Sequence, residues 1–155
     1  MAEMTPAQLL DGVQSWVEQQ YQVAGLQVEV ELHGGRFSPA DLERYATRNR
    51  ACRIALEGLR FEVNGNGRLQ CQGLVVLVAL AGDLGKKGSR ALNVLDVVTP
   101  VTAGLPGSRL GIELEDSIGA KDVRAANLYH AALDKQGTAA WVITWPVKFT
   151  HPRVR

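Results

Sequence analysis

The chain lacks the features that mark several large classes of protein. It has only 2 cysteines, Cys52 and Cys71, and no group of Cys and His residues with the spacing of a zinc site. No apolar run reaches the roughly 20 residues that a membrane-spanning helix needs. No basic stretch followed by an apolar one opens the sequence, so we expect no signal peptide. We interpret the cysteines as reduced, buried thiols of a cytoplasmic chain, the alternative being a bridge between neighbouring strands.

An excess of charge of one sign is also missing. Lys and Arg number 17 and Asp and Glu number 16, which gives a net charge of +1. A protein devoted to duplex DNA normally carries a strong basic excess to neutralise phosphates, so this balance argues against that class. The length of 155 residues and the 46% hydrophobic content fit one globular domain. We expect residues 1–155 to form a single domain.

Residues for catalysis are scarce. His33, His130 and His151 do not accompany a Ser or Cys nucleophile in a recognisable motif, and isolated histidines are weak evidence for a site. The glycine-rich loop at residues 83–89 lacks the spacing of a phosphate-binding loop. We interpret Glu115–Asp116 as a solvated turn. The sequence therefore predicts no enzyme, no cofactor, no metal and no small-molecule substrate.

The most informative stretch that is present runs from residue 69 to residue 82. Between Gly73 and Ala81 it carries no charged residue, and its centre is rich in valine and leucine. A strand covered on both faces has such a continuous apolar run, and β-branched residues favour a pleated sheet. We predict the central strand of a sheet covered on both faces; the alternative is a buried helix.

Two amphipathic helices are predicted around this strand. Thr5 and Gln8 form a capping box, apolar residues follow at helical spacing, and Gly25 ends the helix. Ser89 can cap a second helix, and Pro100 should end it or force a restart.

Further strands are predicted at residues 26–33, 51–63, 110–114 and 139–150. The first has clean alternation, so we place it near a sheet edge. In the second, the parity of the apolar positions changes at Glu57–Gly58, which predicts a bulge, and a turn at 64–67 leads into the central strand. Pro146 predicts that the last strand lies at an edge or leaves the sheet. Residues 122–136 fit a strand or a helix, with a slight preference for a strand.

These elements predict an α+β fold. We expect a mixed, mainly antiparallel sheet of about 4–6 strands flanked by two helices, with a long arm or loop at residues 34–50 between the first two strands. Five arginines fall in or beside the arm: Arg36, Arg44, Arg48, Arg50 and Arg53. A solvated loop is the simplest interpretation, because no row of aromatic residues accompanies them. The alternatives are a nucleic-acid-binding module and an arm that contacts a neighbouring subunit.

The C-terminal half resembles a known family. The similarity lies in Asn127-Leu128-Tyr129, Ala132-Leu133-Asp134, Gly137 and the run from Ala140 to Trp145. Gly34-Gly35-Arg36-Phe37-Ser38 and the order of the elements are similar too. In these residues the chain resembles the Mu-like prophage gp37 family, which is similar in fold to phage tail terminator proteins.

The resemblance implies a structural virion protein without a catalytic site or cofactor. Tail terminators form a hexameric ring that caps the tail tube, ends its polymerisation and offers a surface for head–tail joining. The implied partners are further copies of the chain, the tail tube protein and a neck or head–tail connector protein. The implied location is the head-proximal end of the tail, after assembly in the host cytoplasm, with no membrane partner. A close alternative is another neck, connector or tail-completion protein.

Surface residues of the arm and of the glycine-rich loop are our candidates for contacts with another subunit or the tube. They are Arg36, Phe37, Arg44, Tyr45, Arg48, Arg50, Lys86 and Lys87.

Overall fold

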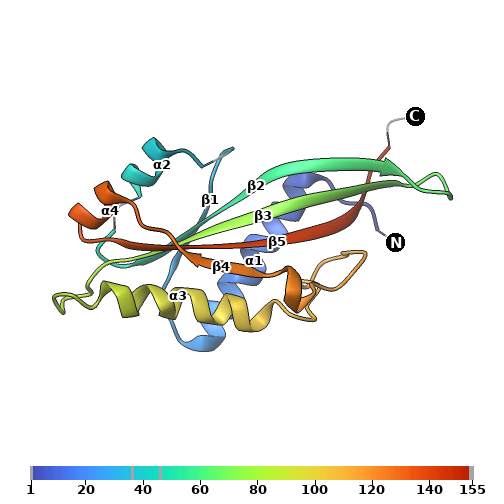
Figure 1. Ribbon diagram of the computed structural model, residues 1–155. Helices are drawn as coiled ribbons and strands as arrows, with labels where there is room; N and C mark the ends of the chain where they lie inside the picture. The colour runs from blue at the N-terminus through green and yellow to red at the C-terminus, as the bar shows by residue number, and fades with distance from the viewer. Residues whose placement is uncertain (1, 36, 46, 154–155) are drawn as a thin grey trace.

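The computed structural model describes residues 2–35, 37–45 and 47–153. Its elements follow the order α1 (Pro6–Ala24), β1 (Glu29–Leu32), α2 (Pro39–Arg44), β2 (Arg50–Val63), β3 (Leu69–Ala81), α3 (Arg90–Gly104), a 3-10 turn η1 (Ala120–Asp122), β4 (Arg124–Asn127), α4 (Ala131–Lys135) and β5 (Ala139–His151). The strands form one sheet in the order β1-β2-β3-β5-β4 (Figure 1). No helix in the described residues is long and apolar enough to cross a membrane.

The sheet confirms the predicted fold class. β1 runs parallel to β2, and the other three neighbouring pairs are antiparallel. α1 and α3 pack against each other and on one face of the sheet. The short helices α2 and α4 lie together at one end of the molecule (Figure 1). The connection between β1 and β2 carries α2 and is the predicted arm.

β3 is the middle strand, as predicted, and every residue from Val75 to Ala81 is buried. Alternate residues such as Leu77 join the main core with α1 and α3. The residues between them, such as Leu80, join a second cluster with Leu133 of α4. Toward the start of β3, this second cluster ends and the prediction of cover on both faces is wrong, because Leu74 is 38% exposed. α2 and α4 are too short to extend that far.

The two long helices differ in how well the sequence anticipated them. α1 has the predicted capping box between Thr5 and Gln8, and its C-cap Gly25 has a φ of 71°. α3, however, continues through Pro100 to Gly104, so the predicted break is wrong. Valines on both sides of the proline pack into the core, and this burial outweighs one lost hydrogen bond.

Ser89 is the N-cap residue of α3, but its side chain makes no capping hydrogen bond. Its hydroxyl donates to the carbonyl oxygens of Asp83 and Lys86 instead. The Asp83 carboxylate accepts the hydrogen bond of the Arg90 backbone N–H at 2.9 Å. The prediction that Ser89 caps through its side chain is therefore wrong, because Asp83 supplies the acceptor.

Two predictions in the C-terminal half need correction. Residues 110–114 form turns and no strand, because Leu110 and Gly111 have φ values of 57° and 65°, which a strand does not allow. Leu110 and Leu114 are nonetheless buried, which explains the misleading alternation. Residues 122–136 contain both structures that we weighed, since β4 comes first and α4 follows.

Pro146 lies in a strand with neighbours on both sides, so its predicted place in an edge strand is wrong for β5 as a whole. The contacts with β4 nevertheless stop at Arg124 and Thr144. Residues two apart in a strand direct their backbone groups to the same side, so Pro146 and Lys148 face the same neighbour. The Lys148 carbonyl accepts a hydrogen bond from the Glu115 backbone N–H at 2.9 Å, on the side away from β3. The proline nitrogen therefore points away from β3, to the side where β4 has already ended.

Candidate interaction surfaces

The first part of the arm is folded back onto the edge of the sheet. The ring of His33, just after β1, stacks on Phe37 at 4.4 Å between centroids and meets Tyr45 edge-on at 5.7 Å. His33 Nδ1 and the Tyr45 hydroxyl share a hydrogen bond. Asp41 Oδ2 lies 3.5 Å from His33 Nε2. Phe37 and Tyr45, two of the predicted contact residues, are therefore partly engaged within their own chain.

Local charge and burial shift two pKa values in this cluster. The side-chain hydrogen bond from Ser38 lowers the pKa of Asp41 below its usual value, with a smaller contribution from His33. Burial raises the pKa of Tyr45. The Arg53 guanidinium lies 5.0 Å from the centre of the Tyr45 ring, a cation–π contact that adds to the packing of the arm.

His33 is a residue whose role the sequence analysis missed. Nothing in the spacing of His33, Asp41 and Tyr45 distinguishes this cluster from chance. The only available signal in the sequence was the glycine pair Gly34–Gly35 between His33 and Phe37, because glycines allow the chain to turn.

The arginines of the arm do not form one free basic patch. Arg50 pairs with Asp96 of α3 at 2.8 Å. Arg53 pairs with Glu29 at 2.8 Å and with Glu31 at 3.5 Å. These acids reduce the positive charge available to a phosphate backbone. Exposed positive side chains remain at Arg44 and Arg48, and Arg36 lies outside the described residues.

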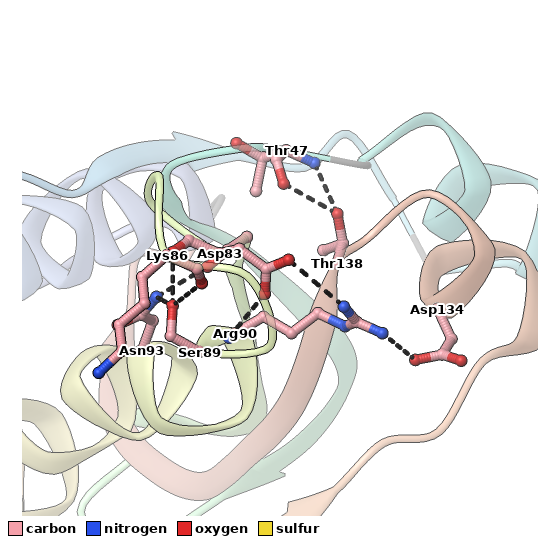
Figure 2. Close-up of polar contacts among 9 residues, drawn as sticks. Thr47, Asp83, Lys86, Ser89, Arg90, Asn93, Asp134 and Thr138 are labelled. Carbon is pink, nitrogen blue, oxygen red and sulfur yellow. Dashed lines mark hydrogen bonds and ion pairs between the residues drawn. The ribbon is translucent and has the colours of Figure 1, made fainter.

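Two sets of polar contacts lie at this end of the molecule (Figure 2): one joins the glycine-rich loop to α4, and the other joins the end of the arm to Thr138, just before β5. The Arg90 guanidinium reaches Asp134 of α4 at 3.1 Å and Asp83 of the loop at 3.5 Å. The Thr47 backbone N–H donates to Thr138 Oγ1, and that hydroxyl donates to the Thr47 carbonyl, both at 2.9 Å. The hydrogen bond from the Arg90 backbone lowers the pKa of Asp83, and Asp134 raises the pKa of Arg90.

Lys86 and Lys87 lie at the exposed tip of this loop. Gly85 and Gly88 on either side have φ values of 83° and 80°, which suit a tight reversal of the chain. Neither lysine makes a salt bridge to a described residue. The loop that carries them, between β3 and α3, lies at the same end of the molecule as α2 and the arm (Figure 1).

A second exposed surface lies on the long hairpin of β2 and β3, and the sequence analysis did not single it out. β1 pairs with β2 only from Ala51 to Ile54. Beyond the bulge after Leu56, β2 has no strand on its outer side among the described residues. Figure 1 shows this hairpin extending past the helices.

Three large apolar side chains line this free part of β2. Leu59, Phe61 and Val63 are 37%, 53% and 53% exposed. They lie on the face that carries α1 and α3, since Phe61 is paired with the core residue Cys71. Phe61 also meets the His151 ring edge-on, at 5.5 Å between centroids. Surface apolar residues are common singly, but a row of three on an unpaired edge is typical of a contact surface.

The described residues offer little for bond-making chemistry. They contain no group of three or more His, Cys, Asp or Glu side chains that could hold a metal ion. Burial raises the pKa of Cys52 to about 12, so this thiol stays protonated at neutral pH. An open groove of about 600 Å³ lies between α1, β1 and the start of β2, and Glu18, Gln22 and Glu29 form part of its wall.

Comparison with models of protein families finds no match, and comparison with curated proteins finds none. Among solved structures, the chain is similar to the sheath/tube terminator of an extracellular contractile injection system, PVC, in the extended state. The TM-score is 0.39 at 9% identity, over 100% of this chain and 62% of that chain. So low a score does not establish a shared fold, and this chain spans less than two thirds of that neighbour. Membership of the Mu-like prophage gp37 family stays a prediction.

Proposed function

We propose that the protein is a structural subunit of a phage tail. Copies of it form a ring that caps the end of the tail tube, ends tube polymerisation and provides the surface for head–tail joining. The resemblance of residues 127–145 to the Mu-like prophage gp37 family supports this proposal. The observed element order, with an arm between β1 and β2 and a long central hairpin, agrees with that resemblance.

The observation that carries the proposal is the apolar, unpaired edge of β2. An open edge of this kind leads to uncontrolled association unless another element covers it. Burial of Leu59, Phe61 and Val63 in an interface is favourable, by about 25 cal/mol for each Å² of apolar surface removed from water. A protein that functions by assembling with protein partners has a use for such an edge.

Termination follows from occlusion. A ring seated on the last layer of the tube buries the interface that the next tube subunit would need, and it presents a different surface outward. We assign the exposed Arg44, Arg48, Lys86 and Lys87 to contacts with an acidic surface of the tube or neck, because they are positively charged. The arm and the glycine-rich loop that carry them lie at the end of the molecule opposite the hairpin (Figure 1). Charges of this kind mainly steer and orient a partner.

The remaining candidates have a supporting role in this proposal. Phe37, Tyr45 and Arg50 shape the arm from within, through the stacking with His33 and the ion pair with Asp96. Arg36, outside the described residues, stays a predicted contact of the same arm.

Deletion of the gene in the phage that encodes the chain tests the proposal. We expect tails of uncontrolled length by electron microscopy, with normal length restored when the chain is supplied from a plasmid. Tails of normal length that fail to join heads would contradict tail termination and would indicate a neck or connector protein. Normal, properly attached tails would exclude both functions.

A further inference from the structure

The free part of β2 directs backbone hydrogen-bonding groups outward at every second residue. Asn64 donates its backbone N–H to the Arg68 carbonyl at 3.0 Å, so Asn64 faces β3 across the hairpin. Successive residues of a strand face opposite sides, and therefore Val63, Phe61 and Leu59 face outward. Each of the three has an N–H and a carbonyl that no described strand pairs with.

The opposite edge of the sheet offers a matching strand. β4 is paired only with β5, and all four of its residues are exposed. The Leu128 backbone N–H donates to the Ala140 carbonyl at 2.9 Å, so Leu128 faces β5. By the same alternation Ala126 and Arg124 face β5, whereas Ala125 and Asn127 direct their backbone groups outward.

We propose that the free part of β2 pairs with β4 of a second copy of this chain. The inference rests on the ring proposed above and names the surface that joins its copies. Within one chain, β2 is antiparallel to β3, β3 to β5 and β5 to β4. β2 and β4 therefore run in opposite directions, and a copy that continues the sheet places its β2 antiparallel to β4.

The faces of the sheet and the charges select one register. Phe61 lies on the helix-covered face, and so does Ala125, which is paired with the core residue Ile143. Placing Phe61 opposite Ala125 brings two outward-facing residues together and puts Glu62 opposite Arg124 on the open face. Glu62 and Arg124 then form a pair without mutual backbone hydrogen bonds, in which side chains approach most closely.

The neighbouring registers are less favourable. A shift of one residue would turn the apolar row to the open face. A shift of two residues in one direction would place Arg60 opposite Arg124, and like charges directly opposite each other are destabilising. A shift of two in the other direction would leave Arg124 opposite Asn64, without an acidic partner.

The dimensions of the two strands agree with this register. Asn127, the last residue of β4, falls opposite Leu59, short of Ile54, where β1 covers β2. The small side chain of Ala125, on the same face as the apolar row, leaves room for the large side chain of Phe61 opposite it. β4 therefore fits onto the uncovered part of β2 without meeting β1 of the second copy.

The register also fixes a stagger between copies. Within one chain Ala125 is paired with Ile143, Ile143 with Leu77, and Leu77 with Ile54. Ala125 and Ile54 therefore lie at the same height along the strands. Between copies Ala125 lies level with Phe61, which is about 20 Å farther along the strand at roughly 3.3 Å per residue, with the bulge residue left out. Because two different surfaces meet, the contact is heterologous, and copies close into a ring where the rotation allows it.

A mixing experiment with single cysteines tests the pairing. We expect Glu62→Cys protein and Arg124→Cys protein, mixed and oxidised, to give a disulfide-linked dimer on a non-reducing gel, and neither protein alone to give one. Cys52 and Cys71 are buried and do not interfere. A dimer from Glu62→Cys alone would show that β2 pairs with β2 and would overturn the proposal, as would the absence of a mixed dimer.

Arg60→Cys provides the register control. Mixed with Arg124→Cys, it should form much less dimer than Glu62→Cys does, because the two Cα atoms would then be diagonal neighbours rather than a directly opposed pair. More dimer from Arg60→Cys than from Glu62→Cys would overturn the register.

Charge reversal separates this inference from the function it rests on. Glu62→Arg or Arg124→Glu should weaken self-association roughly tenfold by light scattering, and the double variant should restore it. Both variants could leave the oligomer unchanged and still restore tail length in the deletion phage. In that case the joining surface proposed here is wrong and tail termination stands. If the charge reversals behave as expected but tails never depend on the chain, the surface stands and the function fails.

Discussion

At the scale of single residues, Gly82 is a position without room for a side chain. A Cβ atom there would lie 2.6 Å from Arg48 Cα and 2.6 Å from the Thr47 carbonyl oxygen. The Gly82 backbone N–H also donates to the Asn49 carbonyl at 3.0 Å. The end of the arm thus passes directly over the end of β3, and only glycine allows that approach.

Gly82→Ala should therefore lower the free energy of unfolding by about 1–3 kcal/mol, the usual cost of overpacking a site whose neighbours are backbone atoms. Urea denaturation followed by tryptophan fluorescence measures this change. Gly34→Ala is the matched control, because a Cβ atom at Gly34 would meet nothing within 4 Å. Equal stability of the two variants would show that the arm moves aside at little cost.

Residue-level predictions from the sequence succeeded where partners are close along the chain. The Thr5–Gln8 capping box spans one helical turn, so the spacing alone reveals it. The ion pair between Arg50 and Asp96 joins residues of different elements and depends on how α3 crosses β2. No local pattern contains that information, and the same holds for the stacking of His33 on Phe37.

At the scale of elements, α3 contains a conflict between local preference and packing. Pro100 lies inside the helix and cannot donate a backbone hydrogen bond to Asp96 four residues earlier. Near Pro100, the Leu95 and Val98 carbonyls accept hydrogen bonds from the Thr99 and Thr102 hydroxyls at 2.8 and 3.1 Å. The helix persists because its valine stripe is buried against the sheet.

Pro100→Ala should raise the free energy of unfolding by about 1–3 kcal/mol, since it restores a donor and removes a ring that strains the preceding turn. Thermal and urea unfolding provide the measurement. Thr99→Ala, at an exposed neighbouring position, controls for helix propensity and should gain at most about 0.7 kcal/mol. A loss of stability in Pro100→Ala would show that the packing of α3 requires the proline ring.

Elements with a strong local pattern were predictable, and elements defined by distant partners were not. The bulge at residues 57–58 and the 64–67 turn follow from parity and turn chemistry, and both are present. That β1 pairs in parallel with β2 depends on where the arm returns the chain. The split of residues 122–136 into β4 and α4 likewise depends on β5, which supplies the partner for β4.

At the scale of the whole molecule, the two exposed surfaces lie at opposite ends of the sheet. The hairpin with its apolar row projects at one end, and the arm, the glycine-rich loop and α4 gather at the other (Figure 1). This separation predicts that substitutions in the surface at one end leave the contacts made by the other end unchanged. The sequence suggested the basic end but gave no hint of the hairpin surface, because the shortness of β1 is a property of the folded sheet.

The double variant Lys86→Glu and Lys87→Glu should weaken binding to tail tubes several-fold, because the proposed partner surface there is acidic. Co-sedimentation with purified tubes measures binding. Self-association of the variant by light scattering should be unchanged. Arg109→Glu, a charge reversal at an exposed residue of another loop, is the matched control. Unchanged tube binding would remove the loop from the contact surface.

The N-terminal segment is tied to the end of β5, since the Met4 backbone N–H donates to the Thr150 carbonyl at 2.8 Å. The segment before α1 and the end of β5 therefore lie beside the long hairpin (Figure 1). A fusion tag or fluorescent label at either terminus would crowd the free part of β2, which we propose pairs with a second copy, so assays on such fusions would understate self-association. An epitope inserted at the tip of the 83–89 loop would leave that strand clear.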